Sequence, residues 1–245
     1  MNQLPLSQWI EITATSRMPL YAILSNVGSS QAVKEYYLHD GRNTPVGLYS
    51  NTPYDAWVSV APMIVPLEEN SPFLNWVENT EHHDWGWLAR SPYPFERIIA
   101  HFRGLVQVIL PDETVVFFRY WDGCWLSEHL RYMGDGWRDV MPPFAFYRVN
   151  GESFCVHISA DAEPKISPWW NVPQGVIDFM MQKDSAPLVT SAMKYLKEQR
   201  PDIFNIYDET VLKARLHRRL RVTGNPPDMS TLIQYIESEM QCDLD

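Results

Sequence analysis

The spacing of apolar residues changes near residue 160, and this change limits the secondary structures that the two parts of the chain can form. Before it, short β-rich runs alternate with helical periodicity. After it, apolar residues recur only at helical spacing. The segment 161–173 holds three prolines and is typical of a linker. We therefore expect an α+β (mixed α/β) fold, in which residues 1–160 form a mixed-sheet domain with flanking helices and residues 174–245 form a small helical lobe.

Serine residues mark the starts of the helices expected in the first part. Ser71-Pro72 and Ser91-Pro92 each place a capping hydroxyl before a proline at the first helical position. Ser29 and Ser30 offer caps to a further helix, which Gly41 ends. The three helices would alternate with strands.

Strands are predicted where β-branched and aromatic residues cluster. In the run 84–90, alternation places Trp85, Trp87 and Ala89 on one face of the strand. Pro66 indicates that the run 63–67 lies towards a sheet edge, because proline has no N–H to donate in a central strand. The other predicted strands of this part are 21–24, 46–50 and 63–67.

Two hairpins close the first part. Runs 106–110 and 114–121 flank the short polar connection 111–113. Residues 115–118 are apolar at successive positions, which predicts a sheet covered on both faces. The second hairpin turns at Asn150-Gly151.

Composition excludes several classes of protein. The 245 residues carry a formal net charge of −10, which disfavours nucleic-acid binding. No apolar run approaches the ~18 residues of a membrane span, and the N-terminus lacks a secretory signal pattern. Three widely spaced cysteines form neither a disulfide framework nor a zinc motif. We expect a cytoplasmic protein with free thiols and no membrane insertion.

Motifs for catalysis or cofactor binding are weak. The loop 25–30 lacks the spacing of a phosphate-binding loop, and the run His82-His83-Asp84 has no cysteine or second histidine group nearby in sequence. We predict no catalytic, cofactor or metal residue. A small hydrolase using an acid pair or a cysteine–histidine pair stays open, with the candidates Cys124, Cys155, His129 and His157.

Aromatic and methionine side chains gather where the linker meets the helical lobe. Trp169 and Trp170 lie in the linker, and Phe179, Met180 and Met181 follow. Such side chains suit adaptable recognition of an amphipathic helix. The alternative is that the two tryptophans pack the two parts of the chain together.

A basic stretch stands out in this acidic chain. Between residues 213 and 221 lie five cations, with Leu212, Leu216 and Leu220 spaced to face inwards on a helix. The stretch is either a solvated helix face or an electrostatic docking face for an acidic partner. The cations are Lys213, Arg215, Arg218, Arg219 and Arg221.

The order of short motifs over residues 20–150 resembles the bacterial type VI secretion effector chaperones, also called adaptors. The chain departs from the family pattern at Glu113, where a turn glycine is usual, and after Asp122. The matching residues are Ala61-Pro62, Ser71-Pro72-Phe73, Trp76, Trp85-Gly86, Arg90-Ser91-Pro92, Leu110-Pro111-Asp112, Phe118-Arg119 and Asp122.

The resemblance implies a non-enzymatic chaperone that binds a toxic effector in the cytoplasm and helps load it onto the VgrG spike. It also implies that the matched motifs are mainly structural and that the helical lobe varies with the cargo. We expect the linker aromatics and the basic stretch to contact the effector or the spike. The alternatives are the small hydrolase and a binding protein that neutralises a toxin.

Overall fold

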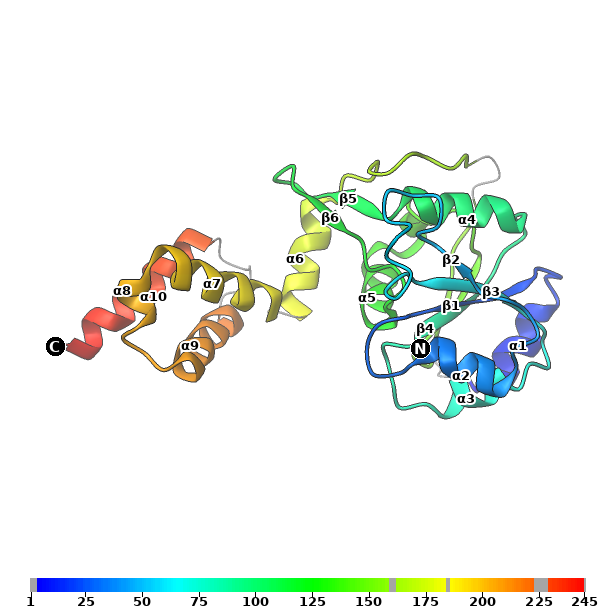
Figure 1. The fold of residues 1–245 in the computed structure, drawn as a ribbon, viewed down its shortest axis with the longest axis horizontal. Helices are drawn as coiled ribbons and strands as arrows, with labels where there is room; N and C mark the ends of the chain where they lie inside the picture. The colour runs from blue at the N-terminus through cyan, green and yellow to red at the C-terminus, as the bar shows by residue number, and fades with distance from the viewer. Residues whose placement is uncertain (1–3, 159–161, 184–185, 223–228, 245) are drawn as a thin grey trace. The chain divides into compact units, whose positions relative to one another are not determined.

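The computed structural model describes residues 4–158, 162–183, 186–222 and 229–244, without the side chains of 186–187, 220–222, 229–230 and 239–244. The chain divides into two compact units, Met1–Val172 and Pro173–Asp245 (Figure 1). The proline-rich segment therefore lies mostly within the first unit. None of the described helices is long and apolar enough to cross a membrane.

A six-stranded sheet forms the centre of the first unit. The strand order is β2-β3-β1-β4-β7-β8, and every neighbouring pair is antiparallel. The predicted α+β fold class is confirmed, and the expected mixed sheet is antiparallel throughout these pairs. The strands are β1 (Leu20–Leu24), β2 (Val46–Gly47), β3 (Met63–Leu67), β4 (Gly86–Arg90), β7 (Phe146–Val149) and β8 (Glu152–Cys155).

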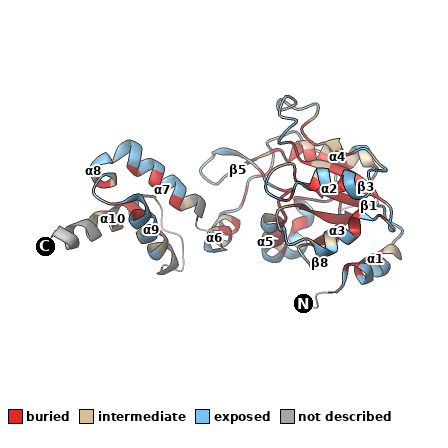
Figure 2. Ribbon diagram, turned by 60° about the horizontal axis from the view of Figure 1, so that its bottom comes forward, coloured by how far each residue is buried: buried red, intermediate tan, exposed pale blue. Residues whose placement is uncertain are grey.

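Helices cover both faces of this sheet (Figures 1 and 2), and the central strands β1 and β4 are buried along their whole length. On one face, Trp9, Tyr36 and Phe73 pack with Leu20 and Leu88 in one apolar cluster. On the other face, aromatic rings from the second set of helices meet the sheet. The first set is α1 (Leu6–Ala14), α2 (Ala32–His39) and α3 (Phe73–Asn79), and the second is α4 (Phe95–Gly104) and α5 (Gly123–Met133), followed by the 3-10 helix Gly134–Asp139.

Trp85 and Trp87 lie on opposite sides of the sheet, contrary to the predicted alternation. Trp85 belongs to the cluster of α1–α3, whereas Trp87 packs against Phe102 on α4, at 6.2 Å between ring centroids. Gly86 between them has φ +133°, and a Cβ there would lie 1.9 Å from the carbonyl oxygen of Ile23. This glycine conformation breaks the regular alternation.

The predicted serine caps are wrong, although the helices lie where expected. The Ser71 hydroxyl donates to Asp40 instead of capping α3. Gln31, with φ +48°, precedes α2 and provides no side-chain cap. Helix α1 is an additional element that was not predicted, and its buried positions Leu6, Trp9, Ile10 and Thr13 follow helical spacing.

Two strand predictions need adjustment. The run 46–50 forms only the two-residue strand β2, which pairs with Met63 and Ile64. Pro66 therefore lies beyond the end of β2, at a part of β3 that pairs on one side only, with β1. There its carbonyl accepts a hydrogen bond from Asn43.

The first predicted hairpin exists but is not covered. β5 (Gln107–Ile109) pairs with β6 (Val115–Phe117) as a separate two-stranded sheet, which projects beyond the six-stranded sheet (Figure 1). Val115 is 45% exposed and Phe117 is 37% exposed. The expectation of a sheet buried on both faces is wrong for β6.

The second unit is helical. Its core holds Leu196 of α7, Ile203 of α8, Leu212 and Leu216 of α9, and Leu232 of α10. The helices are α6 (Gln174–Lys183), α7 (Ala186–Gln199), α8 (Pro201–Phe204), α9 (Glu209–Val222) and α10 (Met229–Leu244). The predicted inward direction of Leu212 and Leu216 is confirmed.

Candidate functional site

Trp170 is an internal part of the first unit. It is 7% exposed, and its ring lies 5.2 Å from Phe118, 6.2 Å from Trp137 and 6.3 Å from His129 between centroids. Its backbone is also held, since the Ile109 N–H donates to the Trp170 carbonyl. Trp170 therefore anchors the proline-rich segment that leads to the second unit, which we call the connecting segment, and its ring is not exposed to a partner.

Trp169 lies against α4 and is half-buried. The Trp169 ring lies 6.2 Å from the His101 ring between centroids, and the Lys165 ammonium lies 4.1 Å from the centroid of the Trp169 ring. Of the α6 residues, Phe179 and Met181 are half-buried and Met180 is 6% exposed. Their part in cargo binding stays a prediction.

The cations of α9 are engaged within the helical unit. Arg215 lies over the Tyr207 ring, and Arg218 donates to the Tyr235 hydroxyl at 2.9 Å. Arg219 lies over the Tyr235 ring at 5.3 Å, and Lys213 pairs with Glu209 at 2.7 Å. The tyrosine contacts join α9 to neighbouring segments, whereas the Lys213–Glu209 pair lies within α9. The side chains of Leu220 and Arg221 lie outside the described residues.

Cys124 and Cys155 lie in settings that disfavour nucleophilic chemistry. Burial, then nearby carboxylates, raises the pKa of the Cys124 thiol, and burial with Asp135 raises that of Cys155. The Cys124 thiol lies 3.5 Å from the His83 carbonyl oxygen. The ring of His129 donates from Nδ1 to the Trp125 carbonyl, and burial lowers its pKa.

Carboxylates also meet structural partners. The open depression between α1 and α3 is lined by Glu69 and Glu78. Glu69 pairs with Arg90 at 3.0 Å, and Glu78 accepts the Leu6 N–H at 2.8 Å. In the described part of the chain, no group of three or more histidine, cysteine, aspartate and glutamate side chains is arranged to hold a metal ion.

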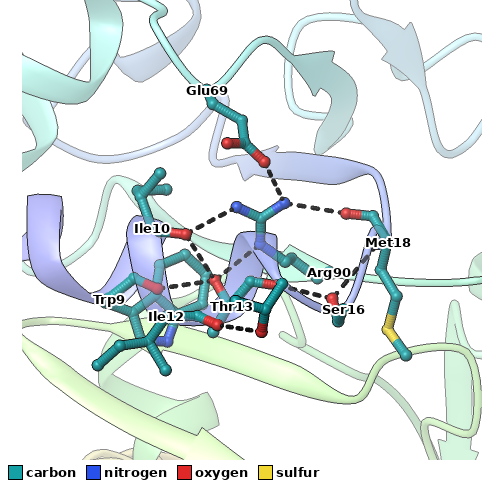
Figure 3. Close-up of polar contacts among 9 residues, drawn as sticks. Trp9, Ile10, Ile12, Thr13, Ser16, Met18, Glu69 and Arg90 are labelled. Carbon is teal, nitrogen blue, oxygen red and sulfur yellow. Dashed lines mark hydrogen bonds and ion pairs between the residues drawn. The ribbon is translucent and has the colours of Figure 1, made fainter.

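Two of the residues that carry the sequence resemblance have structural contacts. Arg90 is 1% exposed and donates to Thr13 Oγ1, Met18 O and Ile10 O (Figure 3). Asp122 caps α5 by accepting the Cys124 N–H at 3.0 Å. The matched residues thus fix the position of α1 and the start of α5.

Three aromatic rings, two of them exposed and one half-buried, form a group where the loop after β2 meets β6. We call Tyr54, Trp57 and Phe117 the surface aromatic cluster. Phe117 lies 4.8 Å from Tyr54 and 5.3 Å from Trp57 between ring centroids, and Tyr54 lies 5.4 Å from Trp57. Trp57 is 47% exposed. The same two segments also carry three exposed valines, Val58, Val60 and Val115.

The loop that carries this cluster is held by local hydrogen bonds. The Thr52 N–H donates to Tyr49 O, the Trp57 N–H donates to Tyr54 O, and Asn26 donates to Val58 O at 3.1 Å. Tyr49 lies beneath the cluster, 3% exposed, and burial strongly raises the pKa of its hydroxyl. Exposed rings on a fixed loop provide apolar contact area at a small cost in conformational entropy.

Sequence reasoning missed this cluster. Residues 55–61 fit neither the helical nor the strand period, and in the structure they form turns. The available signal was Trp57-Val58 within a polar loop rich in turn residues. The partner ring, Phe117, lies in the run 115–118, for which the sequence predicts a sheet covered on both faces.

The first unit is therefore an α+β domain with structural polar contacts and an exposed aromatic cluster. Within it, residues 20–139 match the family described as Domain of unknown function (DUF4123). The match runs from β1 through the 3-10 helix. Neither the curated proteins nor the solved structures include a match to this chain.

Proposed function

We propose that this chain is a non-enzymatic adaptor that binds a type VI secretion effector in the cytoplasm and helps load it onto the VgrG spike. DUF4123 is a domain known in effector adaptors of this system. The region it matches, residues 20–139, contains all the matching residues on which the family resemblance rests.

The observation that carries the proposal is the surface aromatic cluster. An adaptor needs an apolar surface that is held ready for a partner, and aromatic residues dominate the energetics of such surfaces. Trp57 and Phe117 stack on each other while both stay partly exposed. Charged partners would instead meet the arginines of α9, which increase the rate of encounter more than the affinity.

The first test compares the native bacterium with a strain that lacks this chain. We expect the tagged chain to co-purify with an effector and with VgrG, and secretion of that effector to stop in the deletion strain. Another protein secreted by the same machine should still be exported. Unchanged secretion would refute loading, and if the chain instead neutralised the effector, the toxin-binding alternative would take its place.

The second test uses the double variant Trp57→Ala/Phe117→Ala. We expect loss of effector co-purification with little change in stability, because both rings are partly exposed. Tyr37→Ala on α2 is the matched control, since Tyr37 is 52% exposed and lies outside the cluster. Equal binding by both variants would remove the cluster from the proposal.

A further inference from the structure

The open edge of β6 offers a second kind of contact beside the surface aromatic cluster. β5 has a partner on each side. On one side, the Ile109 N–H donates to Trp170 O at 2.9 Å, and the Val172 N–H donates to Ile109 O at 2.8 Å. The Gln107 N–H donates to the Ser167 hydroxyl on the same side, at 3.1 Å. The connecting segment thus closes the outer edge of β5.

The register shows which groups of β6 face away from β5. The Phe118 N–H donates to Val106 O, and the Leu110 N–H donates to Thr114 O. Because bonded pairs recur every second residue in an antiparallel ladder, Val116 is bonded to β5 and its neighbours turn outwards. The outward backbone groups belong to Val115 and Phe117, and no described residue bonds to them.

Val115 and Phe117 also share one face of β6, because they are two residues apart. On that face Phe117 contacts Tyr54 and Trp57. A strand laid along β6 would therefore find backbone hydrogen bonds at two positions about 7 Å apart and aromatic contacts beside them. A partner segment that uses both kinds of contact must have an extended backbone with an apolar side chain at every second residue.

The charges at the end of β6 further indicate which kind of partner segment would bind there. Asp112 and Glu113 are exposed in the turn that leads into β6. The cation at the other end, Arg119, pairs with Asp122 at 2.6 Å. Lysine or arginine flanking the incoming segment would meet the turn carboxylates. A second copy of this acidic chain would bring the same carboxylates and a net charge of −10.

We infer that β6 binds an extended segment of a partner protein by strand addition, with alternating apolar side chains on the surface aromatic cluster and a flanking cation near Asp112 and Glu113. The inference rests on the proposed function and gives its binding mode. Open strand edges are common sites of strand addition in peptide recognition.

The test uses Val115→Pro and its matched control Val115→Thr. Proline removes the outward N–H of residue 115, and an edge position tolerates it, whereas threonine keeps the N–H and a similar shape. The probe is a synthetic nine-residue peptide of alternating valine and threonine flanked by lysines, measured by titration calorimetry. A second probe carries N-methyl groups on its central amides.

We expect Val115→Pro and the N-methylated peptide each to weaken binding at least tenfold, with Val115→Thr close to wild type. Continued slow amide exchange at Val116 in the proline variant would show that the β5–β6 pairing persists. No binding of the first probe, equal loss in both variants, or an unaffected proline variant would each overturn strand addition. Self-association of the chain that is lost in Val115→Pro would overturn it in favour of a second copy.

Failure of this inference can be distinguished from failure of the proposed function. If native co-purification of the effector survives in Val115→Pro but not in Trp57→Ala/Phe117→Ala, the adaptor function stands and strand addition falls. If wild type co-purifies no effector, the adaptor function itself falls.

Discussion

Replacing Arg90 with methionine tests whether the motif residues hold the fold. The guanidinium group, on a residue that is 1% exposed, donates to Thr13 Oγ1 at 2.7 Å, Met18 O at 2.9 Å and Ile10 O at 3.2 Å. Methionine fills much of the same volume but donates nothing. The carbonyl oxygens of Ile10 and Met18 would then lose their charged donor near the end of α1.

The expected cost is about 3–5 kcal/mol, the range for removing one partner of a buried charged group. Summing three charge-assisted bonds at about 1.5–3 kcal/mol each would overestimate it, because α1 can move to let water reach the carbonyls. For a unit of this size the change lowers Tm by roughly 10 °C. It would consume a large share of a typical domain stability of about 5–15 kcal/mol.

Urea denaturation followed by tryptophan fluorescence measures the loss, and amide exchange shows whether α1 opens first. Glu69→Gln is the control. It removes the ion pair to Arg90 but changes a side chain that is 52% exposed, so it should cost less than about 1 kcal/mol. A wild-type unfolding midpoint for Arg90→Met would refute the structural role.

Three further predictions concern other parts of the chain. Burial, with a smaller effect of Lys165, lowers the pKa of His101 to about 4, so the folded state binds its proton less readily than the unfolded state does. Stability should be complete above about pH 6.5 and fall by roughly 3 kcal/mol as the pH drops to 4, and His101→Gln should flatten this profile in urea titrations. Trp170→Ala should cost about 3–5 kcal/mol in the same assay, and an unchanged midpoint would contradict its anchoring role. Reversing Arg215, Arg218 and Arg219 to glutamate should slow partner association at low salt by surface plasmon resonance, and equal rates in variant and wild type would leave only a solvated helix face.

Local patterns predicted the element positions well because apolar period and turn chemistry act within a few residues. The helix expected after Ser91-Pro92 is observed at Phe95–Gly104, and the strand expected at 21–24 is observed at Leu20–Leu24. Prediction failed where distant groups decide. Ser71, for example, donates to Asp40 rather than to its own helix.

The candidate site was the least predictable part. Proline content indicates a free segment around Trp170, yet the rings of Phe118, just after β6, and His129 on α5 pack against that side chain. Conversely, Phe117 lies in a run apolar enough for a core but faces a loop whose course cannot be read from periodicity. Both errors arise because exposure depends on contacts between segments that are far apart in sequence.

The pairing of the connecting segment with β5 limits how such a chain can be recombined in evolution. A joint made near residue 160 would remove the bonds to Ile109 and the Trp170 ring, leaving a damaged hairpin. A joint made after Val172 would leave the first unit with all its own contacts. The C-terminal helices can therefore be exchanged as a module only if the preceding proline-rich segment is inherited with the sheet domain.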